Sequence, residues 1–146
     1  MEIDIKIAKK EHLSQIAEIE AATLPEAWSE SALELFVREG AFAVVALCEG
    51  RVASYCTVID APFETQIINV ATHKDFRRLG YACLVVERVI EESRAQGAEN
   101  ISLEVRESNK AAIELYTKLG FKVEGKRKDF YTKPTENALI MIWRNK

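Results

Sequence analysis

The segment that most constrains the fold is a helix-forming stretch from about Gly80 to Gln96, which lies between two apolar stretches near residue 70 and at 101–105. A strand, a helix and a second strand in this order predict a βαβ unit, in which the strands run parallel and the connection is right-handed. The helix is amphipathic, because apolar or small residues recur at helical spacing at Ala82, Val85, Val86, Val89 and Ser93. The unit is expected to bring the 72–80 turn and the 105–109 segment together at the carboxyl ends of adjacent strands, where open α/β sheets bind ligands.

Further strands and helices surround this unit. The alternation of Ile3, Ile5 and Ile7 predicts a first strand with one buried face. A helix with Leu13, Ile16, Ala17 and Glu20 at its period follows, and Ser29 is a good N-cap for a second helix. The other expected elements are strands at 41–48, 52–59, 66–72, 121–124 and 138–143, and a helix from Ser108 or Asn109 to Leu119. The chain is therefore expected to form one mixed α/β domain over residues 1–146, with a mostly antiparallel sheet around the parallel unit and flanking helices.

The charge of the chain bears on its partners. The formal net charge of −3 argues against a dedicated nucleic-acid binder, whose affinity comes largely from phosphate neutralisation. A basic peptide or an amine remains compatible as a substrate. The basic run Lys122, Lys126, Arg127 and Lys128 is expected to be a solvated strand end and loop.

Three cysteines, Cys48, Cys56 and Cys83, lack the spacing of a metal or redox motif, so they are expected to be small buried side chains in a reducing compartment. The two histidines belong to no metal-ligand pattern, and no metal site is expected. The longest apolar run, 41–48, is too short to cross a bilayer, and acidic residues stand where a signal peptide carries basic ones. These features predict a cytoplasmic protein without a membrane partner.

The turn Arg77–Ala82 is a candidate anion site. It forms the N-terminus of the central helix, where unpaired amides and the helix dipole attract a phosphate group. Gly80 and Ala82 keep side-chain bulk away from the backbone. The alternative interpretation of the turn by itself is a surface loop that caps an ordinary helix.

Two further residues suggest acid–base chemistry. The apolar residues of 101–105 share one face of the strand, and Glu104 points to the other, where partial burial would raise its pKa toward that of a general base. An exposed carboxylate or an ion-pair partner is the alternative for Glu104. On the following helix, Asn109, Ala112 and Tyr116 fall on one stripe that a ligand chain could follow. The alternative for Tyr116 is a core residue with its hydroxyl at the edge.

Together these motifs resemble the GNAT N-acetyltransferase superfamily. Arg77–Ala82 is similar to its (Gln/Arg)-x-x-Gly-x-(Gly/Ala) signature, and Asn69–Thr72 upstream also matches. Leu103–Asn109, followed by Ala111–Phe121, resembles the RimI-type ribosomal-protein-alanine N-acetyltransferases. The resemblance covers nearly the whole chain and is strong from about residue 66. Leu24–Ser29 departs from the pattern, with two residues inserted between its proline and its tryptophan.

The resemblance implies direct transfer of an acetyl group from acetyl-CoA. Glu104 would deprotonate the incoming amine through water, and Tyr116 would protonate the departing thiolate. Trp28 and Tyr131 are the implied substrate contacts, and Arg127 matches the same basic–aromatic segment as Tyr131. The residues implied to bind the cofactor are Val70, Ala71, Thr72, Arg77, Arg78, Leu79, Gly80, Tyr81, Ala82, Cys83 and Asn109.

The implied acceptor is a protein N-terminal α-amine, in particular the N-terminal alanine of a small-subunit ribosomal protein. Another N-terminus, a lysine or a small-molecule amine is the alternative acceptor. A non-catalytic acyl-CoA-binding module is the alternative class of protein, although such a module would need neither Glu104 nor Tyr116. A monomer is the favoured oligomeric state, and nucleic acid is not expected as a direct partner.

Overall fold

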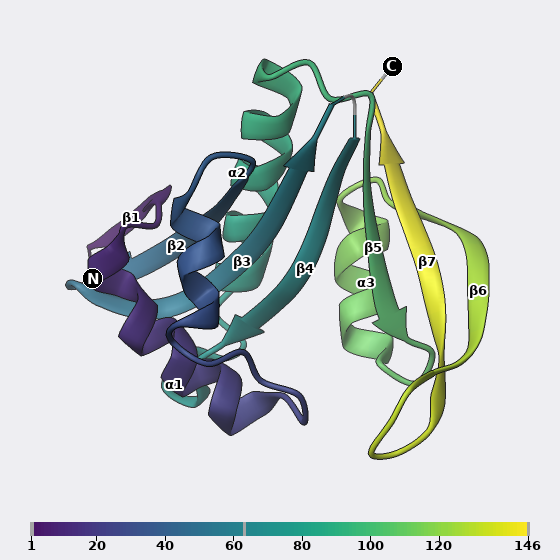
Figure 1. Cartoon of the computed structure of the whole chain (residues 1–146), viewed down its shortest axis with the longest axis horizontal. Coiled ribbons are helices and arrows are strands. Elements are labelled where there is room, and N and C mark those ends of the chain that lie inside the picture. Colours follow the sequence, from purple (N-terminus) through teal and green to yellow (C-terminus); the bar gives the residue numbers. More distant parts are fainter. Residues whose placement is uncertain (1, 63, 146) are drawn as a thin grey trace.

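The computed structural model describes residues 2–62 and 64–145, so three residues of the expected domain, Met1, Phe63 and Lys146, lie outside the described part. The strands form one 7-stranded sheet in the order β1-β2-β3-β4-β5-β7-β6 (Figure 1). The elements in chain order are β1 (Ile3–Ile7), η1 (Lys10–His12), α1 (Leu13–Thr23), η2 (Ala32–Val37), β2 (Ala41–Cys48), β3 (Arg51–Ala61), β4 (Glu64–Thr72), η3 (Lys74–Phe76), α2 (Tyr81–Ala95), β5 (Asn100–Arg106), α3 (Lys110–Lys118), β6 (Lys122–Tyr131) and β7 (Glu136–Arg144). The mixed α/β fold with a mostly antiparallel sheet is confirmed.

Among the strands of the described residues, one pair is parallel: β4 and β5, which α2 connects as expected. Their pairing is short and joins Glu64–Gln66 to Asn100–Ser102. Beyond it the two strands diverge toward their carboxyl ends (Figure 1). A register shift in β4 falls at this point, where Ile68 bulges out of the ladder with β3, and a bulge bends its strand. The prediction that the 72–80 turn and the 105–109 segment lie together is therefore corrected. The two segments follow strands that pair only near their amino ends and lie apart at their carboxyl ends.

Helices cover both faces of the sheet. On one face, α2 packs over Val44 and Ala46 of β2, and α3 lies beside β5 and adds Tyr116 to the same core; on the other face α1 and η2 pack over Val45 and Leu47 (Figure 1). Side chains of a strand alternate between faces, so β2 must supply apolar residues to both layers. This requirement explains why 41–48 is an uninterrupted apolar run.

Three elements differ from the sequence-based expectations. In β1, an edge strand, Ile3 and Ile7 are 41% and 36% exposed and Ile5 packs against the core, so the predicted buried face is formed only at Ile5. The segment after Ser29 is the 3₁₀ helix η2, which begins at Ala32, and the Ser29 hydroxyl accepts a hydrogen bond from the Ala32 N–H. The basic run belongs to β6, a 10-residue edge strand much longer than the expected 121–124.

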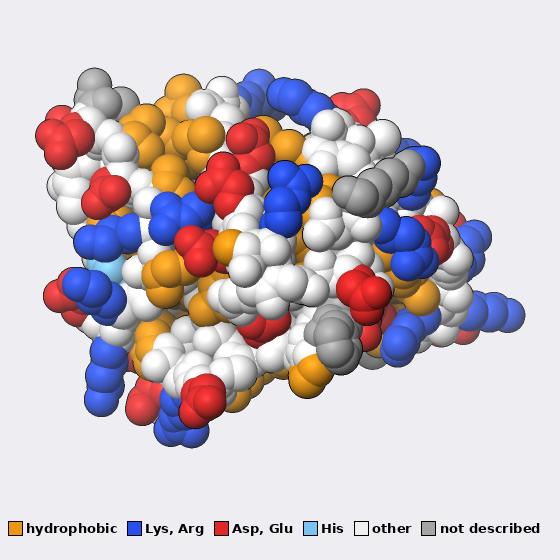
Figure 2. All heavy atoms as spheres, turned by 90° about the horizontal axis from the view of Figure 1, so that it is seen from above, with side chains coloured by type: hydrophobic (Ala, Val, Ile, Leu, Met, Phe, Trp, Pro, Cys, Tyr) orange, Lys and Arg blue, Asp and Glu red, His pale blue; other side chains and the backbone are white. Residues whose placement is uncertain are grey.

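The surface carries both signs of charge. Figure 2 shows Lys and Arg side chains interspersed with Asp and Glu side chains across one face. Of the helices in residues 2–62 and 64–145, none has the length and apolar character that spanning a membrane requires. Cys48 and Cys56 are buried as expected, whereas Cys83 is half-buried and its thiol donates to Glu87 at 3.1 Å.

Candidate active site

A narrow slot of about 130 Å³ lies between β4 and β5 where their pairing stops. Its walls come from β4, β5 and the first turns of α3, and its lining includes Val70, Glu104, Asn109, Ala112 and Tyr116. Within the described part of the chain, β5 pairs with β4 no further than Gln66, so the edge of 67–72 that faces the slot has no strand partner. An unpaired strand edge can form hydrogen bonds to an extended chain that carries amide groups.

The turn that follows β4 presents backbone donors. Arg78 and Gly80 have φ angles of 63° and 83°, and such alternating turns gather N–H groups around a concavity that binds anions. Gly80 is the N-cap of α2, and the Leu84 N–H donates to its carbonyl at 3.2 Å. The N–H groups of residues 81–83 precede this bond and have no acceptor within the helix. These backbone donors belong to the turn at which the sequence predicts an anion site.

Side chains of this turn differ in what they can contact. The Tyr81 ring is 4% exposed and packs in the core, so its backbone alone can meet a ligand. The Cys83 thiol donates a hydrogen bond to Glu87, whereas the sequence predicted that this side chain would be buried. The Arg77 Nε donates to the Thr72 carbonyl at 3.4 Å and ties the turn to the end of β4.

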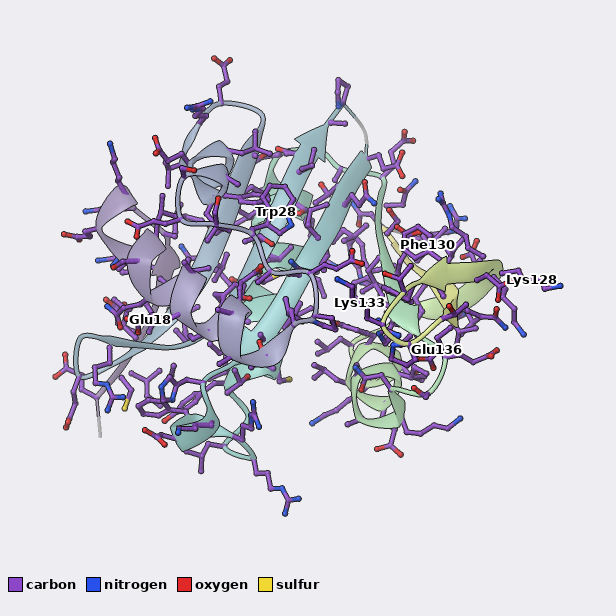
Figure 3. All side chains as sticks on the ribbon, turned by 60° about the horizontal axis from the view of Figure 1, so that its bottom comes forward. Glu18, Trp28, Lys128, Phe130, Lys133 and Glu136 are labelled. Carbon is purple, nitrogen blue, oxygen red and sulfur yellow. The ribbon has the colours of Figure 1, made fainter. Side chains whose placement is uncertain are left out.

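A second cleft of about 300 Å³ adjoins the slot. The loop between α1 and η2 forms one wall with Pro25, Glu26 and Trp28, and the β6–β7 hairpin forms the other with Phe130 and Tyr131. In Figure 3, Trp28 and Phe130 lie on the two sides of the separation between the halves of the molecule. Both predicted substrate contacts, Trp28 and Tyr131, therefore line the same cleft.

Glu104 lines both the slot and the cleft. Its side chain is 18% exposed, and the Arg127 Nε lies 3.1 Å from its Oε2. The geometry of this ion pair does not make a hydrogen bond, so the buried Oε2 accepts none from the described residues. Leaving a buried acceptor without a donor costs roughly 1–3 kcal/mol, more when it is charged. Glu104 is thus an ion-pair partner, which is one of the alternatives that the sequence left open. Its Oε2 can still accept a hydrogen bond from a ligand.

Tyr116 combines the two interpretations that the sequence left open. It is 7% exposed in the core beneath the sheet, with its ring centroid 5.6 Å from that of Phe121, and it also lines the slot. Burial raises the pKa of the Tyr116 phenol, so the hydroxyl keeps its proton at neutral pH. Asn109 is the N-cap of α3, where its Oδ1 accepts from the Ala112 N–H at 3.2 Å, and it lines the slot as well.

Tyr131 is a neutral phenol in the cleft. Burial, reinforced by the negative charge of Glu104, raises the pKa of Tyr131 to about 12. The Arg106 guanidinium lies over its ring, 4.5 Å from the centroid. The ring is therefore held in place by a cation–π contact at the wall of the cleft.

Glu20 is a site residue to which the sequence reasoning gave no role. It is fully buried in α1, and its Oε1 accepts from the Trp28 N–H at 2.9 Å. Its Oε2 accepts from the Tyr55 hydroxyl at 2.8 Å and from the Asn69 Nδ2 at 3.0 Å. The carboxylate thus joins α1 to the Trp28 loop and to β4. A charged residue at an apolar position of the helical period is the signal that could have found it.

The described residues contain no group of three or more His, Cys, Asp or Glu side chains placed to hold a metal ion. The polar groups at the site are backbone N–H donors, a carboxylate acceptor and phenol hydroxyls. They suit an organic ligand with amide and phosphate groups, and proton transfer beside it.

Comparison with known proteins identifies the family of the chain. Residues 13–121 match the Acetyltransferase (GNAT) family. A protein of Bacillus subtilis (strain 168), provisionally named a ribosomal protein bS18-alanine N-acetyltransferase, is 31% identical over 139 residues, which are 94% of this chain and 92% of that protein. The ribosomal protein bS18-alanine N-acetyltransferase of Escherichia coli (strain K12) is 35% identical over 94 residues, 63% of this chain and 64% of the relative, so that match spans less than two thirds of its length.

The crystal structure of the ribosomal-protein-S18-alanine N-acetyltransferase from Escherichia coli superposes with a TM-score of 0.91 at 28% identity, and the match covers 98% of this chain and 94% of that chain. The chain belongs to the GNAT acetyltransferase family. It is an N-acetyltransferase that uses acetyl-CoA as its acetyl donor.

Proposed function

We propose that this enzyme, with a catalytic domain over residues 1–146, acetylates the N-terminal α-amine of a protein, and that its acceptor is the N-terminal alanine of ribosomal protein bS18. The names of the Escherichia coli and Salmonella typhimurium relatives support this acceptor. The observation that carries the chemistry is the position of Glu104, because its side chain lines the slot and the cleft at once. A donor in the slot and an amine in the cleft would meet beside one carboxylate.

The slot and the turn are the proposed acetyl-CoA site. The unpaired edge at Val70–Thr72 would bond to the amides of the pantetheine arm and polarise the thioester carbonyl. The turn from Arg77 to Cys83 would hold the diphosphate on its backbone N–H groups, and Asn109 would bond to the cofactor from the opposite wall. Bound acetyl-CoA supplies the acetyl group, and the protein supplies orientation and proton transfer.

Two side chains move protons in this proposal. An α-amine with a pKa of about 7.7–8.0 is partly neutral at neutral pH; as its nitrogen forms the new N–C bond it becomes positively charged and must lose one proton, which a carboxylate can take. Glu104 takes that proton through water at its Oε2, which lacks a hydrogen-bond donor from the described residues. As the C–S bond breaks, the Tyr116 hydroxyl gives its proton to the sulfur, and its raised pKa keeps that proton available at neutral pH.

Glu104→Gln tests the mechanism. It should lower kcat/KM for acetyl transfer by roughly 10²–10⁴-fold, because general-base catalysis is lost, and leave the affinity for acetyl-CoA unchanged. Glu91→Gln, an exposed change on α2, is the matched control and should behave as wild type. Tyr116→Phe should lower the rate in the same way. Equal turnover by Glu104→Gln and wild type would remove Glu104 from the mechanism.

A peptide panel tests the acceptor. Transfer is measured to a peptide with an N-terminal alanine, to the same peptide with a blocked amine and an added lysine, and to a polyamine. We expect transfer to the free alanine terminus alone. Transfer to the lysine peptide or to the polyamine would assign the alternative acceptor.

A further inference from the structure

Arg106 lies beside the proposed base without a role in the steps described above. It is the last residue of β5 and follows Glu104 by two positions. Because side chains alternate along a strand, both side chains leave the same face of β5. Both also line the cleft. The Arg106 side chain is therefore placed where the acceptor enters.

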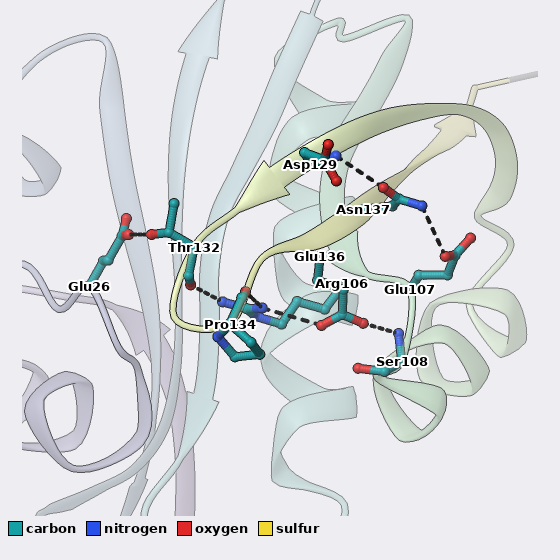
Figure 4. A network of polar contacts seen from close by, with 9 residues as sticks. All are labelled: Glu26, Arg106, Glu107, Ser108, Asp129, Thr132, Pro134, Glu136 and Asn137. Carbon is teal, nitrogen blue, oxygen red and sulfur yellow. Dashed lines mark hydrogen bonds and ion pairs between the residues drawn. The ribbon is translucent and has the colours of Figure 1, made fainter.

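The Arg106 guanidinium holds the β6–β7 loop (residues 132–135) by its backbone (Figure 4). Its Nη2 donates to the Thr132 carbonyl at 2.8 Å and its Nη1 to the Pro134 carbonyl at 2.9 Å. The Nη1 also lies 3.2 Å from Glu136 Oε1. The same group covers the Tyr131 ring. One side chain thus fixes the loop, its flanking glutamate and the aromatic wall of the cleft.

The loop in turn touches the opposite wall. The Thr132 hydroxyl donates to Glu26 Oε1, which belongs to the two-residue insertion between α1 and η2 (Figure 4). This hydrogen bond joins residues 106 positions apart in the sequence and crosses the separation between the two halves of the molecule. The path from Arg106 through Thr132 to Glu26 thus runs from one wall of the cleft to the other.

Arginine suits this task better than lysine. A planar guanidinium can bond to two carbonyls and a carboxylate and still stack on a ring, whereas an ammonium is a compact charge that cannot do all four. We propose that Arg106 is a positioning residue for acetyl transfer, which through residues 131–135 and Glu26 holds the acceptor terminus in line with Glu104. This inference rests on the proposed function of the cleft as the acceptor site.

Arg106→Lys tests the proposal, and Arg144→Lys is its control. Arg144 also binds a carboxylate, with distances of 2.6 and 3.1 Å to Glu124, but at the opposite end of the β5–β7 ladder. Arg106→Lys should raise KM for an alanine-terminated peptide by roughly 10–100-fold, because binding of the peptide must then order a loop and an aromatic wall that the guanidinium no longer holds in place. The KM for acetyl-CoA should stay at the wild-type value, and kcat should change much less than the peptide KM. Arg144→Lys should leave all three constants unchanged.

A second pair of variants isolates the hydrogen bond across the cleft. Thr132→Val removes the hydroxyl that donates to Glu26 and keeps the carbonyl that Arg106 binds. It should raise the peptide KM, and Thr132→Ser, which keeps a hydroxyl, should restore it. Hydrogen exchange of the amides of residues 131–133 and 135 should become faster in Arg106→Lys and stay unchanged in Arg144→Lys.

The outcomes separate the two proposals. An unchanged peptide KM in Arg106→Lys, or equal losses for peptide and acetyl-CoA together with a lower melting temperature, would overturn the positioning role and leave the proposed function standing. A wild-type enzyme that transfers acetyl to no N-terminal peptide would refute the acceptor assignment, and the positioning role with it.

Discussion

Replacing Glu20 with glutamine should strongly lower the free energy of unfolding, although the shape of the side chain is nearly kept. The carboxylate is 0% exposed and accepts hydrogen bonds from Trp28, Tyr55 and Asn69. Glutamine keeps one oxygen and puts an NH₂ donor in the place of the other. In either orientation of the amide, at least one of the three buried donors then faces another donor.

The magnitude follows from the hydrogen bonds that the amide cannot accept. A hydrogen bond to a charged group is worth about 1.5–3 kcal/mol, and a buried donor left unpaired costs about 1–3 kcal/mol. If one or two of the three bonds are broken, Glu20→Gln should cost about 2–5 kcal/mol, a large part of the ~5–15 kcal/mol that stabilises a typical domain. Tyr55→Phe removes one of the donors, so in the Glu20→Gln background it should cost less than it does in wild type.

Urea denaturation followed by tryptophan fluorescence measures the effect. With an m-value of about 1–3 kcal/mol/M, the Glu20→Gln transition should move by roughly 1–3 M. In a double-mutant cycle with Tyr55→Phe, the coupling between the two positions should be about 0.5–3 kcal/mol. A loss below about 1 kcal/mol for Glu20→Gln, or strictly additive changes in the cycle, would refute the reasoning, because either result means that the carboxylate does not bind these donors in solution.

Two other predictions concern the hairpin and the turn. Hydrogen bonds from Ser108 and Arg106 hold the pKa of Glu136 below its usual value of 4.5. The stabilisation by the Glu136 carboxylate is therefore complete above pH 4.5, and it is lost as the pH falls through the lower pKa that Glu136 has in the folded protein. Thermal melts from about pH 7 to about pH 3 should therefore show a flatter acid limb for Glu136→Gln than for wild type, and parallel limbs would contradict this. At Gly80, where φ is 83° and an added Cβ meets no atom within 4 Å, alanine should cost about 1–2 kcal/mol of unfolding free energy because the strain is conformational, and asparagine should cost less. Equal costs for the two variants in urea denaturation would show that the backbone here is not held in the left-handed region.

The parts of the fold that were predictable depend on local signals. The bounds of α2 match the expected helix to within a residue, because Gly80 is its N-cap and Gly97 has a φ of 85° just beyond its end. Asn109 caps α3 through its own side chain, as its place before an apolar stripe indicates. Such signals act over a few residues, and tertiary contacts do not shift these helix ends.

The features that sequence reasoning missed depend on interactions between distant segments. Ile3 and Ile7 are exposed because β1 lies at the sheet edge, which an alternating pattern cannot reveal. The hydrogen bond between Glu26 and Thr132 requires two loops to meet across the cleft. Glu20 was predicted in part. Its place in the helical period indicates that it is buried, and a buried carboxylate needs hydrogen-bond donors, but the sequence does not show which residues supply them.

The site depends on where the β4–β5 ladder stops. If pairing continued beyond Gln66, β5 would occupy the strand edge at 67–72, which is proposed to bind the cofactor. Glu104 would then lie on the face of a continuous sheet and could not line the slot and the cleft together. The bulge at Ile68 lies at the point where β4 leaves β5, and Ile68 and Glu104 both line the slot and the cleft, so the break in the ladder and both cavities meet beside the proposed base.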